Sequence, residues 1–166
     1  KAGCDGAYIE PKPDWPEADQ DPEQSPLRAS SNQSEMIANT LTVTGDVSIS
    51  QGSRSLKADS ASLNRNNNEL TLSGNVEIRE PGMLMRGTDA NIDTDTGLGH
   101  IENARMVQHD SGVRVSAGLS NRPSEQIIEL EKATYTQCVP GDEVWQLGAS
   151  KMVLDNSTGW GSAKMR

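Results

Sequence analysis

The sequence contains no phenylalanine, and aromatic residues make up only 3% of its 166 positions. Any hydrophobic core must therefore be built from Val, Ile, Leu and Met, so we expect a thin one. Long apolar runs are absent too, and none approaches the roughly 18 to 20 residues that a membrane-spanning helix needs. The length suits one domain with its own core. We therefore expect a single water-exposed domain with no membrane-spanning helix.

Histidine is scarce, and the residues that could carry catalysis or hold a metal are not grouped. His100 and His109 belong to no Cys/His cluster, which leaves a zinc site without support. Asp110 and Ser111 follow His109 directly, and sequence neighbours cannot converge on one substrate atom as a hydrolytic triad does. We therefore predict no enzyme activity, no metal and no cofactor.

Basic residues are outnumbered by acidic ones, 15 to 24, and the net charge of -9 repels nucleic-acid backbones. Residues 1–40 hold three basic and eight acidic side chains and five of the eight prolines. Such a segment buries too little apolar surface to offset its ordering entropy. We predict an acidic, proline-rich extension over residues 1–40, either disordered or lying against the domain near Tyr8 and Ile9. The domain itself is predicted over residues 41–166.

From residue 41 the sequence alternates between apolar and polar residues, the pattern of a half-buried β-strand. The segment LTVTGDVSIS, which starts at Leu41, returns from Leu70 as LTLSGNVEIR, with Gly45 and Gly74 at the same place. Two further steps of the same length reach Asn103 and Lys132, so the repeat loses its glycine but keeps its register. Internal repetition of this kind indicates stacked β units.

Other segments also have the residue pattern of strands. Strands are predicted near residues 54–64, 83–93, 112–119, 126–137 and 145–155. Between Ala58 and Ala61 the apolar residues change parity, which predicts a bulge or corner in that strand. The fold class is therefore all-β. Two architectures fit, a β-jelly roll of repeated antiparallel strands or a short β-solenoid.

The two cysteines, Cys4 and Cys138, lie near opposite ends of the chain. They could be one buried thiol and one thiol in the extension, or each could pair with a cysteine outside this sequence. If they pair with each other, the closed loop removes about 5 kcal/mol of unfolded-state entropy in the chain-entropy model. The residues alone leave these three alternatives open.

Two groups of residues resemble a known family. The repeated strands around Thr44–Val47 and Ser73–Val76, with Ala58–Leu63 after the first, resemble the OstA/LptA-like jelly roll of lipopolysaccharide transport. The segment Ala133–Leu147, a strand ending in Thr-Gln-Cys-Val-Pro-Gly and followed by Trp145, is similar to the segment that closes the N-terminal periplasmic domain of LptD proteins. The resemblance covers residues 40–166, with the cysteine segment as its specific part.

The resemblance implies a transport module and not an enzyme, on the periplasmic face of the outer membrane of a Gram-negative bacterium. It implies that the domain receives lipopolysaccharide from LptA, joined edge to edge by β-augmentation. The lipid would then pass to a C-terminal β-barrel and the lipoprotein LptE. It also implies that Cys4 and Cys138 form disulfides with cysteines of that barrel.

The lipid A acyl chains are expected inside the roll, against inward-facing apolar residues. These residues are Val43, Val47, Ile49, Leu72, Val76, Ile78, Met85, Ile92 and Ile101. The same residues would also serve as an ordinary core. A core without Phe fills a wide roll poorly, so we expect space for acyl chains between them.

Two other classes of protein also fit an acidic β-protein. One is a β-solenoid adhesin or carbohydrate-binding module, which should expose aromatic platforms. The other is a self-polymerising structural β-protein, which should form concentration-dependent filaments without any effect of lipid.

Overall fold

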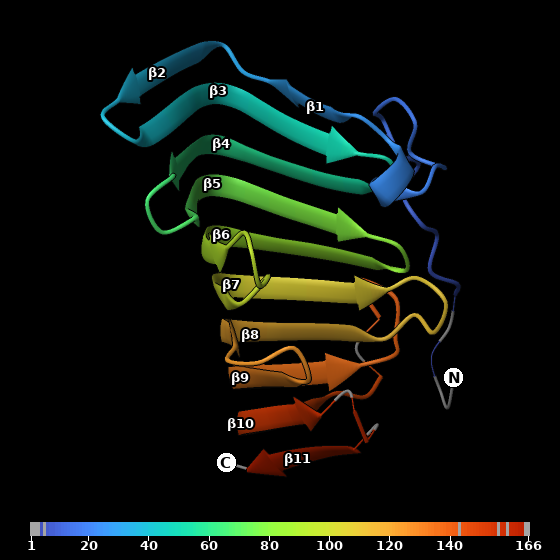
Figure 1. Cartoon of the computed structure of the whole chain (residues 1–166). Coiled ribbons are helices and arrows are strands. Elements are labelled where there is room, and N and C mark those ends of the chain that lie inside the picture. The colour runs from blue at the N-terminus through green and yellow to red at the C-terminus, as the bar shows by residue number, and fades with distance from the viewer. Residues whose placement is uncertain (1–3, 5, 143, 156, 159, 165–166) are drawn as a thin grey trace.

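The computed structural model describes residues 4, 6–142, 144–155, 157–158 and 160–164. These residues form one antiparallel sheet of eleven strands (Figure 1). The strands are β1 (Leu27–Ser30), β2 (Gln33–Ile37), β3 (Thr40–Gln51), β4 (Arg54–Asn64), β5 (Glu69–Glu80), β6 (Met83–Asp93), β7 (Gly99–Gln108), β8 (Arg114–Arg122), β9 (Ile127–Thr136), β10 (Leu147–Asp155) and β11 (Trp160–Lys164). A single turn of 3-10 helix, Pro22–Gln24, precedes them.

From β3 to β11, strands that follow one another along the chain are paired, and β1 and β2 both pair with β3. All of these pairs are antiparallel. The predicted all-β fold of antiparallel repeats is confirmed, and the alternative β-solenoid is wrong because its coils would pair in parallel. The sheet is an open, jelly-roll-like structure whose described ends are β1 with β2 and β11. No helix among the described residues is long and apolar enough to cross a membrane.

The sequence repeat appears in the backbone as a repeated left-handed residue. Gly45, Gly74, Asn103 and Lys132 all have positive φ, between 49° and 79°. At the first two sites the pairing register shifts by one residue, which marks a β-bulge. The bulge predicted between Ala58 and Ala61 of β4 is therefore found beside these residues. The extra residue, however, lies in each of the two neighbouring strands, β3 and β5, and not in β4 itself.

The bulge of β5 provides a test of why glycine is present there. Gly74 has φ +76°, and a Cβ atom would collide with the carboxylate of Asp59, which also accepts a hydrogen bond from Asn75 at 3.0 Å. We expect Gly74→Ala to lower the free energy of unfolding by about 2 kcal/mol in urea denaturation. Gly97→Ala is the matched control, because Gly97 has φ +72° and open space around it. An equal loss in both variants would show that the contact with Asp59 contributes nothing.

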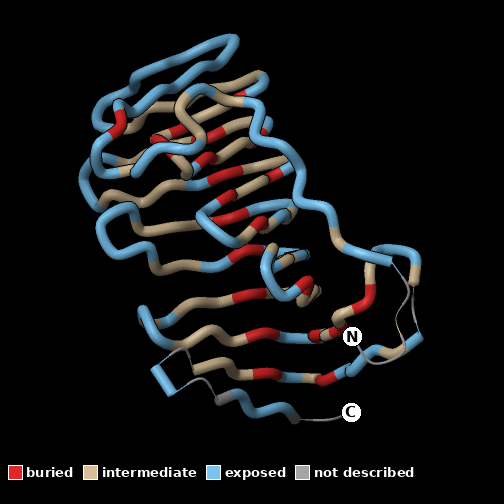
Figure 2. The backbone as a smooth tube through the Cα atoms, turned by 90° about the vertical axis from the view of Figure 1, so that its right-hand side faces the viewer, coloured by how far each residue is buried: buried red, intermediate tan, exposed pale blue. Residues whose placement is uncertain are grey.

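The sheet buries two apolar clusters along one face. One lies under β3 to β7 and includes Val47, Leu72 and Val76, each at most 2% exposed. The other lies under β8 to β10 and includes Leu130 and Ala133. Figure 2 shows the buried residues recurring near the middle of successive strands. The apolar face is therefore continuous across the sheet, as the alternating sequence predicts.

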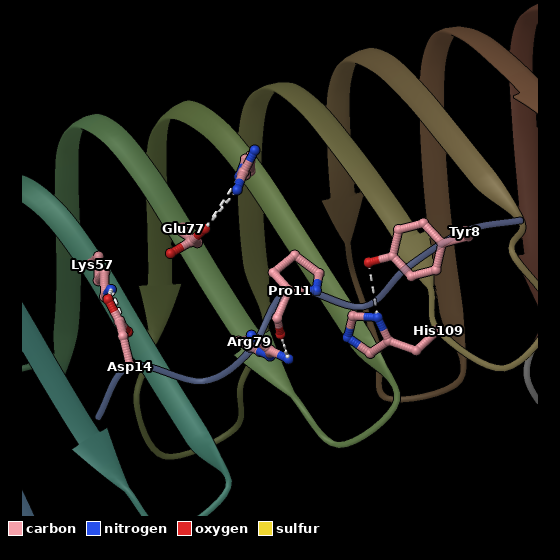
Figure 3. A network of polar contacts seen from close by, with 8 residues as sticks. Tyr8, Pro11, Asp14, Lys57, Glu77, Arg79 and His109 are labelled. Carbon is pink, nitrogen blue, oxygen red and sulfur yellow. Dashed lines mark hydrogen bonds and ion pairs between the residues drawn. The ribbon is translucent and has the colours of Figure 1, made fainter. Parts of the chain in front are cut away.

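The N-terminal residues differ from a simple tail. Strands β1 and β2 already pair with β3, so the sheet begins before residue 41, where alternation predicts the domain boundary. Residues 6–17, here called the strap, run along the sheet on the face opposite the apolar clusters (Figures 1 and 3). Of the two residues expected near the domain, Tyr8 contacts it, whereas Ile9 is 84% exposed.

Candidate lipid-binding interior

All nine residues predicted for the lipid-binding interior belong to the cluster under β3 to β7. Four of them are buried, namely Val47, Leu72, Val76 and Ile101. The other five, Val43, Ile49, Ile78, Met85 and Ile92, are partly buried and pack against the first four. Their alternation along each strand brings them together, because every second residue of a strand faces the same side. The margins of this apolar interior are thus only half covered.

Sequence reasoning missed the second cluster, under β8 to β10. Its residues include Val115, Ala117 and Met152 in addition to Leu130 and Ala133. The sequence repeat did contain a signal for this cluster, because Leu130 lies three repeat lengths after Val43 and so occupies the equivalent inward-facing position. The second cluster extends the apolar face beyond the nine predicted residues, toward β10.

A cavity of about 20 Å³ lies where the two clusters meet, lined by Met85, Met106, Val115 and Leu130 among others. This volume corresponds to about one water molecule and is far too small for an acyl chain. Valine, isoleucine and leucine, together with a series of alanines, bring the packed surfaces close together here. The space for acyl chains that the lack of phenylalanine led us to expect would therefore have to lie outside this cavity.

Cys4 and Cys138 form a disulfide with each other, across 134 residues. Cys138 is fully buried, and the Arg114 guanidinium donates hydrogen bonds to the carbonyl oxygens of Cys138 and Val139 at 2.6 and 3.1 Å. The bond ties the start of the strap to the loop between β9 and β10. Of the alternatives open from sequence, mutual pairing is the one present in this structure.

The strap is held by contacts with successive strands and turns (Figure 3). The Tyr8 hydroxyl lies 3.0 Å from Nδ1 of His109, and the two rings stack. The buried Arg79 guanidinium donates to Glu10 and to the Pro11 carbonyl oxygen, both at 2.6 Å. The strap therefore covers a row of polar residues on the outer face.

Further along, the strap makes three more contacts with the sheet. The Lys57 ammonium group donates to both carboxylate oxygens of Asp14 at 2.7 and 2.6 Å. The Trp15 indole donates to the Gly52 carbonyl oxygen at 2.8 Å, and its ring lies 5.4 Å from the Arg79 guanidinium. Acidic residues of the extension are thus matched to basic residues of the sheet.

These contacts change the acidity of two strap residues. The hydrogen bond from Lys57 lowers the pKa of the Asp14 carboxyl below its ordinary value. Burial raises the pKa of the Tyr8 phenol, and the nearby Glu10 carboxylate adds to this rise. The Asp14 shift thus comes from a basic residue of the sheet, whereas the Tyr8 shift comes mainly from burial and is opposed by the charges of Arg79 and Arg86.

Within the described residues, a group of three possible metal ligands occurs at Cys4, Cys138 and Asp142. Both sulfur atoms of this group are already used in the disulfide. His109 lies in the turn between β7 and β8, where the Gly112 amide donates to the Gln108 carbonyl oxygen at 2.9 Å. The segment from His109 to Gly112 is therefore a turn, as predicted.

Comparison of the chain with known proteins identifies its family. A family model described as LptA/(LptD N-terminal domain) LPS transport protein matches residues 27–160. The chain belongs to this family. The LptA/LptD N-terminal domain match begins at β1, which agrees with the observed start of the sheet.

Relatives named LPS-assembly protein LptD support the same assignment. The one from Pseudomonas putida strain GB-1 is 40% identical over 164 residues, which cover 96% of this chain and 17% of the relative. The one from Saccharophagus degradans is 37% identical over 98% of this chain and 19% of the relative. The chain therefore spans less than a fifth of the length of these LptD relatives.

A solved structure is also similar to this member of the LptA/LptD family. It is the crystal structure of LptH from Pseudomonas aeruginosa, described as the LptA homologous periplasmic component of the lipopolysaccharide transport device. It is 15% identical and covers 87% of this chain and 86% of its own, with a TM-score of 0.37.

Proposed function

We propose that this domain takes part in lipopolysaccharide transport by holding lipid A acyl chains against the apolar interior of the sheet. The family assignment supports the substrate class. The observation that carries the proposal is the apolar cluster under β3 to β7, whose margin residues Val43, Ile49, Ile78, Met85 and Ile92 are only partly buried. Half-covered apolar residues in a row offer a surface on which acyl chains could replace water.

The small cavity between the clusters sets a condition on this proposal. Because its volume is about 20 Å³, acyl chains would lie along the partly buried margin or would separate the packed surfaces. The proposed role is binding and transfer without catalysis, on the periplasmic face of the outer membrane. The lipid would arrive from LptA and leave toward the β-barrel and LptE.

The proposed contact with LptA is edge to edge. β2 is a short terminal strand whose five residues are all exposed, including Met36 at 49% and Ile37 at 65%. β11 lies at the other described end of the sheet. Unpaired backbone groups on such an edge can extend the sheet of a partner. We also propose that Cys4 and Cys138 exchange their mutual bond for disulfides with the barrel cysteines in the longer protein.

Site-specific photo-crosslinking tests the lipid path. A photoreactive residue at Ile78 or Val76, both in the apolar cluster, is expected to capture lipopolysaccharide, because it would lie beside the acyl chains. At Asn75, which is exposed, or at Glu77, which pairs with Arg86 on the outer face, it should not. The measurement is the lipid-shifted band after irradiation with purified lipopolysaccharide.

The four positions are consecutive and alternate between the two faces of the sheet, and Glu77 is the stricter outward control because Asn75 lies in the bulge with positive φ. Circular dichroism of each labelled protein shows whether the buried label at Val76 disturbs the fold, and Ile78 at the margin tolerates a larger side chain. Equal capture on both faces, or no capture in folded protein, would leave the domain as a docking platform without a lipid path.

A further inference from the structure

The outer face of the sheet carries a second hollow, separate from the apolar interior. It is a groove of about 600 Å³ over β6 to β9, between the strap and the loop that joins β9 to β10. Tyr8 and Pro11 of the strap form one wall, and Trp145 of the loop forms another. This outer groove exists only because the strap and the loop, joined by the disulfide, both stand above the sheet.

The outer groove contains two arginines in an unfavourable arrangement. Arg86 and Arg105 are direct partners across β6 and β7, and like charges at such positions destabilise a sheet. Arg86 has a partner in Glu77 at 3.1 Å. The exposed Arg105 side chain makes no ion pair or hydrogen bond within the described part of the chain. The Arg105 guanidinium is therefore available to a ligand in the groove.

Carboxylates neutralise two other basic residues of this face. Asp14 pairs with Lys57 and Glu10 pairs with Arg79, but no such group reaches Arg105 within the described residues. The third arginine of the groove, Arg114, donates to neutral carbonyl oxygens. With Asp142 as the acidic residue of the lining, three arginines make the outer groove locally positive in a chain of net charge -9.

A buried donor without a partner lies beside the outer groove. Nε1 of Trp145, which lines the outer groove, is buried and has no acceptor among the described residues. Buried donors in folded proteins nearly always have a partner, so an orphaned one needs an explanation. This nitrogen is buried and the Trp145 ring packs against Tyr135, so an anion in the outer groove would accept from the Arg86 and Arg105 guanidinium groups and not from the indole.

We propose that the outer groove binds a phosphate group carried on a saccharide. A phosphate monoester has close to two negative charges and three acceptor oxygens, enough for the two guanidinium groups of Arg86 and Arg105, whereas one carboxylate offers two oxygens and a single charge. Tyr8, Pro140 and Trp145 line the outer groove and supply a wall for the attached sugar. The anion site rests on the groove itself, and the choice of a phosphorylated saccharide rests on the proposed function.

The test is calorimetric titration of the 166-residue chain with an acyl-free, bisphosphorylated glucosamine disaccharide. The same disaccharide without phosphate, inorganic phosphate and an acidic peptide are titrated in parallel. Arg105→Gln is expected to weaken binding of the phosphorylated disaccharide about tenfold, the loss of one charge-assisted contact. Arg65→Gln, the same charge change in the exposed turn between β4 and β5, should weaken it less than twofold.

Urea unfolding accompanies the titration, and Arg105→Gln should be at least as stable as the original chain because it removes a like-charge pair. Equal weakening by Arg105→Gln and Arg65→Gln would overturn the site, as would equal binding of the unphosphorylated disaccharide. Tight binding of inorganic phosphate or of the acidic peptide would overturn the assignment to a phosphorylated saccharide. An acyl-free probe does not report on the apolar interior, so failure here leaves the crosslinking result at Ile78 standing.

Discussion

Replacing Leu72 with alanine is expected to lower the free energy of unfolding by about 3 kcal/mol. Leu72 is fully buried in β5, between Ala61 of β4 and Ala90 of β6. Its small neighbours cannot fill the cavity, because alanine has no rotamer that reaches into it. Urea denaturation followed by far-UV circular dichroism measures the loss.

The control for this variant is an exposed leucine of the same sheet. Leu27 of β1 is 68% exposed, and Leu27→Ala should change the stability by less than about 0.5 kcal/mol. If Leu72→Ala lost no more than Leu27→Ala, the cluster under β3 to β7 would not be a packed core. The same pair of variants therefore tests the placement of the interior independently of any lipid.

Removing the disulfide by Cys4→Ser with Cys138→Ser is expected to cost about 4 kcal/mol of stability while leaving a cooperative unfolding transition. The bond joins cysteines 134 residues apart, so its main effect is to restrict the unfolded chain. The sheet itself is joined by hairpins between neighbouring strands, which do not depend on the bond. Denaturant midpoints with and without the two substitutions measure the effect.

Reduction of the original chain with dithiothreitol provides the matched condition and should reproduce the loss seen in the double variant. Loss of the cooperative transition would show that the cysteines are required for the fold. An unchanged midpoint would show instead that the two thiols do not pair in this domain. The titration of the phosphorylated disaccharide should also weaken in the double variant, because the disulfide holds the wall of the outer groove.

Much of the sheet was predictable because strand formation here is a local property. Alternation placed β3, β4, β5 and β6 within one residue of their observed bounds, and the sequence repeat marked Asn103 and Lys132 as equivalents of the left-handed glycines. Local pattern also selected the nine interior residues, because side-chain direction alternates along any strand. It did not resolve β1 and β2, because those strands are exposed and carry no apolar alternation.

The choice between jelly roll and solenoid depended on whether neighbouring strands run antiparallel or parallel, which alternation within one strand does not encode. The docking of the strap could not be predicted from local pattern either. Its contacts, Glu10 with Arg79, Asp14 with Lys57 and Tyr8 with His109, join residues that are 43 to 101 positions apart in the chain.

The sequence by itself determined the positions of β3 to β6, the apolar face and the family, because each depends on the spacing between near neighbours in the chain. Only the tertiary structure decided that Cys4 meets Cys138, that the cavity between the two apolar clusters is small, and that Arg86 faces Arg105 in the outer groove. Those features depend on distances between segments remote in the chain, which folding alone brings together.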